Sequence, residues 1–304
     1  MDRFSVIIPA YNAASTIGRA VESVMRQTQP AHEIIVVDDG STDDTAASLE
    51  RYRDHIKLLR QPNGGVGAAH NTAIAKATGE FVVLIDADDE WEPTRLQRIG
   101  EYAKAHPDID LITTEARVMF PDGTSKLYYA DGGREFPDSS RQVEAILRRN
   151  FIYGGAAVRL EAMRRVGGFD VEAPHQGEYE VWVRLLVSGS RAGLVRDPLC
   201  FYHHSGAGHS ADVAGASRTI ERVLLHVVEE HSLSRREVAA AQSQLARVRR
   251  TYTVADAVRA LRTSSPDARR LARAVVGDRT QSFGLRAKFA VAAVLPAVAR
   301  VLGR

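Results

Sequence analysis

Three aspartates stand within four positions in the segment Asp86-Ala87-Asp88-Asp89, directly after the apolar run at residues 81–85. Carboxylates two positions apart at the end of a strand can converge on one hard cation and hold Mg²⁺ or Mn²⁺ against a diphosphate. A role as caps of the next helix explains the cluster poorly, because like charges cost free energy unless a cation compensates them. An EF-hand is excluded, since Trp91 stands where its loop requires glycine. The segment is therefore predicted to bind a divalent cation.

A second acidic pair, Asp38 and Asp39, closes the apolar run at residues 34–37 and precedes a glycine turn. A carboxylate fixed at the end of a buried strand can accept the imide N–H of uracil or thymine, which would read a base. The alternative is that both aspartates cap the following helix, as Ser41 and Asp43 can. A calcium-binding loop is excluded because the ligand spacing is wrong.

A glycine-rich turn, Asn63-Gly64-Gly65-Val66-Gly67, leads into a predicted helix. Such a turn offers bare backbone N–H groups and the positive end of a helix to a phosphate. It is not the dinucleotide-binding fingerprint, because His70 stands where the third glycine is needed. A tight loop that lets the helix pack closely is the alternative interpretation.

Glutamates and histidines in the second half of the chain supply further ionisable groups. Glu180 and Arg184 form an i,i+4 pair on a predicted helix, which makes Glu180 a structural acid. Glu178 lies at the helix start beside an aromatic side chain and is the better candidate for a general base. The pair His203-His204 is a candidate for metal or phosphate contact, and a flexible polar loop is the alternative.

Short apolar runs alternate with helical patterns along the first 115 residues. The runs predict strands at residues 5–8, 33–37, 56–59, 81–85 and 111–114, and the patterns predict helices at 15–26, 43–53, 67–77 and 93–105. Farther on, strands are predicted at 154–160 and 193–196, and helices at 141–149 and 179–189. This alternation indicates an α/β fold with a mainly parallel central sheet flanked by helices. Ligands gather at the carboxyl ends of the strands in such sheets, where the acidic motifs fall.

The charge of the chain is unevenly distributed, although the net charge is only +2. Residues 216–304 contain 17 Lys and Arg against 7 Asp and Glu, and residues 1–215 contain 23 against 31. The basic tail either meets an anionic partner such as lipid headgroups or is an arginine-rich solvated surface. We expect a domain at residues 1–215, with halves 1–115 and 116–215, and a basic helical C-terminal extension at 216–304.

No segment predicts secretion or a membrane span. The apolar run after Arg3 is too short for a signal peptide, and nowhere do 18 apolar residues follow one another. The single cysteine, Cys200, cannot form an internal disulfide. A cytoplasmic location is expected, with peripheral attachment to the inner face of the membrane if the tail at 286–304 lies in the interface. Packing of that tail on the protein or on a partner subunit is the alternative, a homo-oligomer remains open, and no nucleic-acid partner is expected.

In this order, the segments at residues 5–12, 37–43, 63–71, 84–89, 167–170 and 178–184 resemble family 2 glycosyltransferases of the GT-A fold. The resemblance implies inverting transfer of a sugar from a nucleotide-diphosphate donor with Mn²⁺ or Mg²⁺. A UDP- or dTDP-linked donor is favoured only through Asp39. It covers roughly residues 4–210. The acceptor would be a glycan, a lipid-linked or a small molecule, in the synthesis of a cell-surface polysaccharide, glycolipid or glycoconjugate.

The resemblance also implies roles for individual residues. Glu178 would be the general base and Asp39 would read the nucleotide base, while Asp88, Asp89 and His204 would face the metal. The remaining donor-binding positions would be Pro9, Tyr11, Asn63, Gly67, His70, Asp86 and Ala87, with Asp86 near the ribose.

Three positions depart from the family pattern. His70 stands where the family usually has Arg, which weakens the positive charge offered to the diphosphate or makes it pH-dependent. Tyr202 stands where an Arg often precedes the histidine aligned with His204, and Glu178 replaces the usual Asp. These departures motivate the alternative of a catalytically weakened binding or scaffold protein on the GT-A fold.

Two other enzyme classes fit less well. A processive polysaccharide synthase is disfavoured because spanning helices and a Gln-x-x-Arg-Trp segment are missing from the sequence. A nucleotidyltransferase would need a glycine-rich basic loop after the first strand, where Pro9-Ala10-Tyr11-Asn12 stands instead.

Overall fold

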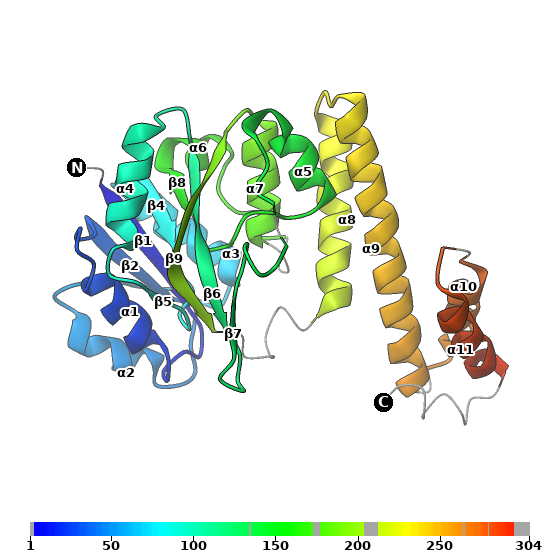
Figure 1. The fold of residues 1–304 in the computed structure, drawn as a ribbon. Coiled ribbons are helices and arrows are strands. Elements are labelled where there is room, and N and C mark those ends of the chain that lie inside the picture. Colours follow the sequence, from blue (N-terminus) through cyan, green and yellow to red (C-terminus); the bar gives the residue numbers. More distant parts are fainter. Residues whose placement is uncertain are drawn as a thin grey trace. The chain divides into compact units, whose positions relative to one another are not determined.

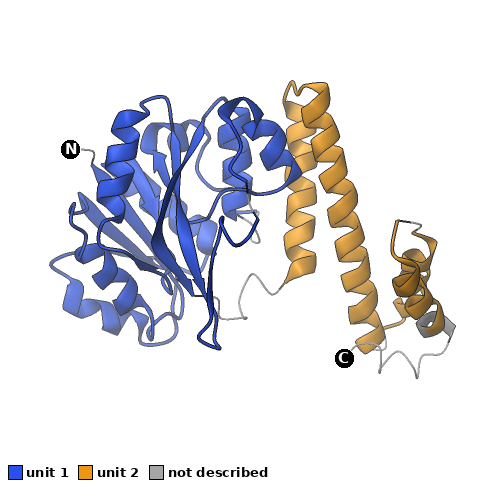
Figure 2. Ribbon diagram, viewed as in Figure 1, with its two compact units in different colours: residues 1–207 blue, residues 208–304 orange. Residues whose placement is uncertain are grey.

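The computed structural model describes residues 3–133, 135–172, 177–203, 212–263, 265–278 and 280–294. The chain forms two compact units, Met1–Ala207 and Gly208–Arg304, coloured separately in Figure 2. The first, unit 1, has an α/β architecture, and the described part of the second, unit 2, is helical (Figure 1). The boundary expected at residues 215/216 lies inside the first helix of unit 2, α8 (Val213–Glu230).

Unit 1 is built on one mixed sheet. Its strands, as far as the described residues go, are β1 (Phe4–Ala10), β2 (Glu33–Asp38), β3 (Lys57–Arg60), β4 (Phe81–Leu84), β5 (Glu90–Trp91), β6 (Leu111–Met119), β7 (Ser125–Leu127), β8 (Ala157–Arg159) and β9 (Ala192–His203). They pair in the order β3-β2-β1-β4-β8-β6-β9-β5, with β7 beside β6. The predicted parallel pairing is confirmed for β3-β2-β1-β4 and for β6 with β9. β8 is antiparallel to both of its neighbours, and β5 to β9, so the second half of the sheet is mixed.

Helices connect these strands at the predicted places, with ends shifted by a few residues. They are α1 (Ile17–Met25), α2 (Thr45–Leu49), α3 (Val66–Lys76), α4 (Arg95–Ala105), α5 (Gln142–Arg148), α6 (Leu160–Arg165) and α7 (Gly177–Val187). Short 3-10 turns at η1 (Glu50–Tyr52) and η2 (Ser139–Arg141) complete two of the predicted helical segments. The sequence therefore predicts the succession of elements in unit 1 well and their ends less well.

The core of unit 1 lies on both faces of the sheet. Every residue of β1 is buried, and alternate side chains such as Val6 and Ile8 pack in one cluster with Val21 of α1 and Leu96 of α4. Ile7 points to the opposite face, where α3 contacts β1 and β2. A strand buried on both faces is expected to be a continuous apolar run, which is the pattern that revealed β1 and β4 in the sequence.

The last strand of unit 1 is much longer than predicted. The sequence indicates a strand only at residues 193–196, because Pro198 lacks a backbone donor and reads as a break. In the structure, β9 continues through Pro198 to His203, and its register with β6 shifts around Glu115. The irregularity accommodates the proline, because a bulged position needs no ladder hydrogen bond. As a result β9 carries Tyr202 and His203 to the edge of the sheet where β4 ends.

Unit 2 consists of α8, α9 (Arg235–Arg262), α10 (Ala268–Gly277) and α11 (Phe283–Val294) among the described residues. α8 and α9 lie side by side (Figure 1), and a capping box starts α9, in which Ser234 N donates to Glu237 Oε2 at 2.6 Å. Ala257 of α9, Ala272 and Val275 of α10 and Phe289 of α11 form a small separate core. Helix α9 ends shortly before Pro266, and α10 ends at Gly277.

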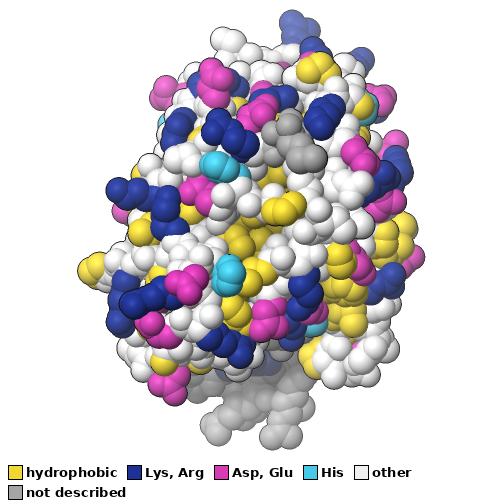
Figure 3. Space-filling view, turned by 90° about the vertical axis from the view of Figure 1, so that its left-hand side faces the viewer, with side chains coloured by type: hydrophobic (Ala, Val, Ile, Leu, Met, Phe, Trp, Pro, Cys, Tyr) yellow, Lys and Arg dark blue, Asp and Glu magenta, His cyan; other side chains and the backbone are white. Residues whose placement is uncertain are grey.

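Two surface properties of the described residues bear on possible partners. None of the helices described in the structure combines the length and apolar character that a bilayer span requires. Figure 3 shows one face of the molecule on which basic and acidic side chains are interspersed. A surface with interspersed positive and negative charges is typical of a solvated face, and it creates no extended electrostatic potential of one sign.

Candidate active site

Three parallel strands of unit 1 bring their carboxyl ends to one edge of the sheet. Ala10 at the end of β1 pairs with Asp38 at the end of β2, and Ile7 pairs with Leu84 at the end of β4. The loops that begin after these strands therefore start side by side, as predicted for the acidic motifs. Open α/β sheets bind ligands at this edge.

Asn12 ties the first two loops together. Its backbone has φ 50°, a left-handed conformation that asparagine tolerates better than most residues. Its N–H donates to Ser41 Oγ at 3.0 Å, and Thr42 N donates to Asn12 Oδ1 at 2.9 Å. Ser41 and Asn12 therefore fix the loop after β1 against the loop after β2, which gives Ser41 a role beyond helix capping.

The buried carboxylate of Asp39 organises the glycine-rich turn. One oxygen accepts hydrogen bonds from Gln61 Nε2 at 2.8 Å and Gly64 N at 2.9 Å, and the other accepts from Gly65 N at 2.8 Å. A carboxylate offers about four acceptor sites, so roughly one remains for an imide N–H. Asn63 stabilises the same turn by accepting from Gly65 N at 3.2 Å.

The neighbouring Asp38 has a different environment. It is fully buried, accepts from Ser41 N at 2.9 Å and pairs with Arg60 at 3.2 Å, so it supports the turn and does not cap α2, whose N-cap is Asp44. Tyr11 is 51% exposed at the same edge, whereas Pro9 is buried within β1. The exposed ring available to a nucleotide is therefore that of Tyr11.

The helix α3 binds the turn at residues 167–170 of the second half. Asn71 Nδ2 donates to the carbonyl of Phe169, and Phe169 N donates back to Asn71 Oδ1, both at 2.8 Å. Gly168 has φ 75°, and a Cβ there would lie 2.4 Å from Asn71 Oδ1, so only glycine fits. A Cβ on Gly67 would already be in contact with Phe169 at 3.6 Å. The glycines of both segments thus permit close packing between the two halves of unit 1.

His70 lies within this contact. It is 2% exposed and stacks on the ring of Phe169, with ring centroids 4.4 Å apart. Burial lowers the pKa of His70 to about 4, so the imidazole is neutral near neutral pH. The sequence predicts a weakened or pH-dependent positive charge at this position. In the structure, His70 carries no charge near neutral pH.

The acidic turn after β4 contains one aspartate that is committed to the fold. Asp89 is 2% exposed; Tyr153 Oη donates to one of its oxygens at 2.9 Å and His203 N donates to the other at 3.1 Å. Burial raises the pKa of Asp89 to about 7, although the His203 N–H opposes that shift. Asp89 therefore fastens the end of β9 to the turn, and its proposed contact with a metal would compete with these bonds.

Asp86, Asp88 and Glu178 lie close to this anchored aspartate. Burial raises the pKa of Asp86 well above its ordinary value, and the charges of Asp89, Glu178 and Asp88 raise it further. Glu178 thus approaches the turn from α7, although the chain separates it widely from Asp86. The structure brings these predicted residues together in one cluster of carboxylates.

The start of α7 positions Glu178. Its carboxylate lies over Gly154, where an added Cβ would be 3.5 Å from Glu178 Oε1. On the same helix, Glu180 is buried and pairs with Arg184, which also donates to the carbonyl oxygens of Val166 and Gly168. The structural role predicted for Glu180 is confirmed, and it joins α7 to the turn at residues 167–170.

A buried arginine supports the acidic turn from below. Arg95 is fully buried, donates to Thr114 Oγ1 and to the carbonyl of Gly155, and stacks over Trp91 at 4.9 Å. Beside it, the hydroxyl of Tyr153 contacts Cys200 Sγ at 3.1 Å. No sequence motif marks Arg95 or Tyr153, because a lone Arg in a helix or Tyr in a loop carries no pattern.

The histidines that follow β9 are only partly described. His203 Nε2 lies 3.9 Å from Glu90 Oε1, and burial and the charge of Arg19 lower the pKa of His203. His204, predicted to face the metal, lies outside the described residues. Within the described part of the chain, no group of three or more His, Cys, Asp or Glu side chains has the arrangement of a metal site.

Tyr202 lies among the same carboxylates. Burial raises the pKa of its phenol to about 12, and the charges of Asp89, Asp86, Asp88 and Glu178 contribute to that rise. A neutral hydroxyl therefore occupies a position beside four acids where the family pattern often has a cation.

Comparison with known proteins identifies relatives. The family model described as glycosyl transferase family 2 matches residues 5–166. An uncharacterized glycosyltransferase of Nostoc sp. is 48% identical over 240 residues, which cover 71% of this chain and 69% of the relative. TuaG of Bacillus subtilis, a glycosyltransferase named for teichuronic acid biosynthesis, is 31% identical over 208 residues, 65% of this chain and 77% of TuaG. The chain spans 35% or less of the length of several other curated relatives.

Solved structures share the fold. TarS 1–349 of S. aureus in complex with UDP-GlcNAc superposes with a TM-score of 0.62 at 18% identity, over 99% of this chain and 89% of that one. The mannosyltransferase PcManGT of Pyrobaculum calidifontis in complex with GDP-Man and Mn²⁺ gives a TM-score of 0.63 at 20% identity, over 99% and 84%. The GT-A fold predicted from the sequence motifs is confirmed.

The neutral state of His70 predicts a pH-dependent contribution to stability. The unfolded chain protonates His70 near pH 6.5, and the folded protein resists until about pH 4, so stability is lost as pH falls between these values. Relative to His70→Gln, the wild type is expected to lose about 3 kcal/mol of unfolding free energy between pH 7 and pH 4. Denaturant unfolding of both proteins at several pH values measures the difference, and a constant difference would contradict the buried neutral imidazole.

Proposed function

The chain belongs to glycosyl transferase family 2, and from this premise we propose that it transfers a sugar from a UDP- or dTDP-linked donor to an acceptor hydroxyl with inversion. The observation that supports this most directly is the convergence of Asp39, Asp86 and Asp88 at one edge of the sheet with Glu178. Three of these acids follow parallel strands and the fourth arrives from the second half of unit 1. The arrangement provides donor-binding groups and a separate base at one site.

The proposed nucleotide specificity rests on Asp39. Its carboxylate is held rigidly by the glycine-rich turn and keeps roughly one acceptor site, which suits the imide N–H of uracil or thymine. The exposed ring of Tyr11 at the neighbouring strand end supplies a stacking surface for the base. The TarS complex contains UDP-GlcNAc and the PcManGT complex contains GDP-Man, so the shared fold accepts either base and Asp39 favours the first.

The acidic turn is proposed to take a divalent cation such as Mn²⁺ or Mg²⁺ together with the donor's diphosphate, because the described side chains alone form no metal-binding group of three or more. Asp86 is surrounded by three further acids that raise its pKa, which is the situation that a bound cation relieves. Asp88 would hold the ion, with Asp89 and His204 as further predicted ligands, and Asp86 and Ala87 would lie along the ribose and diphosphate. When bound, the ion neutralises the charge that develops on the departing diphosphate.

Glu178 is proposed as the general base. It lies at the first turn of α7, close enough to Asp86 to raise the pKa of that acid. In the reaction, the acceptor oxygen forms a bond to the anomeric carbon as the bond to the diphosphate breaks, and Glu178 takes the hydroxyl proton. Attack from the face opposite the leaving group inverts the anomeric centre. Positioning and proton removal are the contributions of the chain's own residues.

The acceptor is proposed to be a glycan or a lipid-linked or small molecule in the synthesis of a cell-surface polysaccharide, glycolipid or glycoconjugate. The similarity to TuaG, which is named for teichuronic acid biosynthesis, supports this role.

Unit 2 is proposed to bring the enzyme to an anionic membrane surface. Residues 259–304 hold 10 basic and 2 acidic residues. Arg269, Arg270 and Arg273 are exposed along one face of α10, and Phe283 at the start of α11 is 85% exposed. Exposed cations beside an exposed aromatic ring are typical of interfacial helices. A lipid-linked acceptor would be consistent with such attachment.

The first prediction from this function concerns donor binding. The wild type is expected to bind UDP more tightly with Mn²⁺ than without it, and Asp88→Asn is expected to lose that enhancement while still binding UDP alone. Isothermal titration calorimetry measures both affinities. Asp54→Asn, which changes an exposed aspartate of the same unit, is the control and should behave like the wild type. Absence of UDP and dTDP binding in the wild type would contradict the proposed donor.

The second prediction concerns the base. Glu178→Gln is expected to lower kcat about 10²- to 10⁴-fold, because it removes the proton acceptor, and to leave the donor affinity nearly unchanged. Hydrolysis of UDP-sugars with Mn²⁺ supplies the assay. Glu161→Gln, which alters an exposed acid in the first turn of α6, is the matched control. A variant at Glu178 that retains wild-type kcat would assign proton removal to another group.

The third prediction concerns the membrane. Full-length protein is expected to float with vesicles that contain phosphatidylserine and to stay behind with pure phosphatidylcholine vesicles. The double variant Arg269→Gln, Arg273→Gln should bind roughly 30-fold more weakly, since each basic residue contributes about 1 kcal/mol near such a surface. The charge-matched control Arg235→Gln, Arg236→Gln changes exposed residues of α9 and should bind like the wild type. No flotation of the wild type, or equal losses in both variants, would contradict a specific role of α10.

A further inference from the structure

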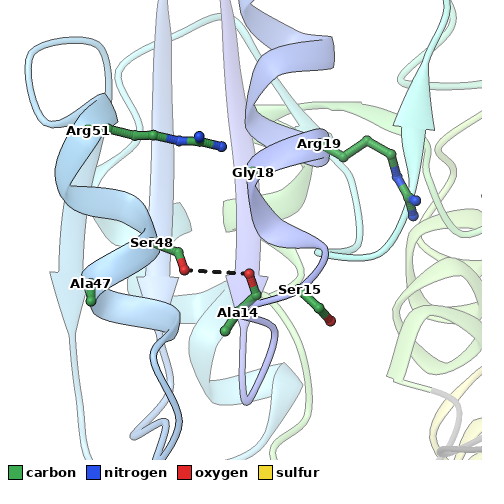
Figure 4. A pocket seen from close by; sticks show the side chains of 7 residues that line it. All are labelled: Ala14, Ser15, Gly18, Arg19, Ala47, Ser48 and Arg51. Atoms are coloured by element: carbon green, nitrogen blue, oxygen red, sulfur yellow. Dashed lines mark hydrogen bonds between the residues drawn. The ribbon is translucent and has the colours of Figure 1, made fainter.

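Two arginines line one surface pocket of about 290 Å³ between α1 and α2, and in Figure 4 Arg51 points toward α1 whereas Arg19 points away from Arg51 on the other side of α1. Arg51 reaches across α1 to Glu22 at 3.3 Å, a contact that Gly18 permits because a Cβ there would lie 2.7 Å from Arg51 Nη2. Both partners of that ion pair are largely exposed. Such pairs contribute little to stability or to a distant site.

Arg19 extends from α1 toward the acidic turn. Its Nη2 donates to the backbone carbonyl of Asp88 at 2.6 Å, a short, charge-assisted bond between groups 69 residues apart in the chain. The charge of Arg19 also lowers the pKa of His203, after the larger effect of burial. The guanidinium therefore lies beside both the turn and the end of β9.

The bond from Arg19 acts on a backbone position that sequence motifs do not reveal. The carbonyl of Asp88 lies at the middle of the turn, and the N–H of Asp89 is held separately by the carbonyl of Asp86 at 3.1 Å. These two bonds hold the C=O and the N–H of the peptide group between Asp88 and Asp89, and so fix the backbone from which the side chain of Asp88 extends. Within the described residues, Arg19 Nε is buried and has no hydrogen-bond partner, so the fold leaves part of this side chain's bonding capacity unused.

Arg19 also differs from the other arginine near the turn. Arg95 lies fully buried beneath it and is bonded to Thr114 and Gly155, whereas Arg19 is partly exposed at its edge. A positive charge at that edge opposes the mutual repulsion of the carboxylates. It also attracts a metal–nucleotide complex, whose net charge is negative.

We propose that Arg19 is a positioning residue that holds the Asp88 turn in the conformation that binds the metal–nucleotide complex. The inference rests on the proposed function of the site and concerns its affinity for the donor's diphosphate end. The base-binding end at Asp39 lies on another loop and is independent of it. Loss of Arg19 is therefore expected to affect binding only when the metal takes part.

Calorimetry with UDP, with and without saturating Mn²⁺, tests this proposal. The ratio of the two affinities is expected to fall roughly tenfold in Arg19→Gln, in line with the loss of one charge-assisted hydrogen bond. The affinity for UDP alone should stay as in the wild type. Arg51→Gln, on the opposite side of the same pocket, is the matched control and should change neither value.

Two results would overturn the proposal. One is an unchanged ratio in Arg19→Gln, and the other is an equal loss of UDP affinity with and without Mn²⁺, which indicates a general structural role. If Arg19→Gln does not fold, Arg19→Lys is tested instead, since it keeps the charge but loses the planar guanidinium. The ratio of the UDP affinities with and without Mn²⁺ should then fall roughly threefold. A wild type that binds UDP under neither condition would instead contradict the proposed function of the site.

Discussion

Repulsion among four carboxylates is the constraint around which unit 1 is arranged. The pKa of Asp86 is raised by the charges of three nearby carboxylates, those of Asp89, Glu178 and Asp88. A fold can tolerate such a cluster by protonating a member, by bonding it to neutral donors or by leaving it open to a cation. Asp89 is bonded to neutral donors, since it accepts from Tyr153 and from the backbone of β9, and burial raises its pKa. The remaining acids lie nearer the surface, where charge compensation can come from a ligand.

The position of Glu178 depends on contacts that begin far away in the chain. The side chain of Asn71 on α3 hydrogen-bonds both the carbonyl and the N–H of Phe169. Arg184 of α7 donates to the carbonyl of Gly168. Helix α7, and Glu178 with it, is thereby fixed to the helix that follows the glycine-rich turn. Because Asp39 holds that turn, Asp39, which is proposed to read the nucleotide base, and the proposed general base belong to one connected set of contacts.

The sequence predicts the part of the site that lies on strand ends. Apolar runs of four or five residues mark β1, β2 and β4, and the parallel order then places Asp39 and Asp86 at one edge. That Glu178 would approach this edge followed only from the resemblance to a family, because no local pattern encodes a contact between residues so far apart. The anchoring of Asp89 was missed for the same reason: its partners are a hydroxyl on Tyr153 and a backbone N–H on β9.

Some element ends are marked by a local sequence signal, and others are not. Ser234 and Glu237 form the spacing of a capping box, which marks the break between α8 and α9 in the sequence itself. The extension of β9 through Pro198 has no such signal, since it depends on a register shift against β6. Strand propensity is read from one segment of the sequence, whereas a bulge depends on how two strands pair.

At position 70 the family usually has Arg, and here a packed, neutral histidine replaces that positive charge. The reason is the contact between α3 and the turn at residues 167–170. A charged side chain between α3 and the turn at Phe169 would have to be desolvated, and no acid is hydrogen-bonded to His70 in the described part of the chain. A neutral imidazole stacked on Phe169 avoids that cost and strengthens the contact between the two halves of unit 1. Positive charge near the acidic turn then has to come from elsewhere. Arg95 is buried near the turn, and the partly exposed Arg19 donates to the Asp88 carbonyl at its edge.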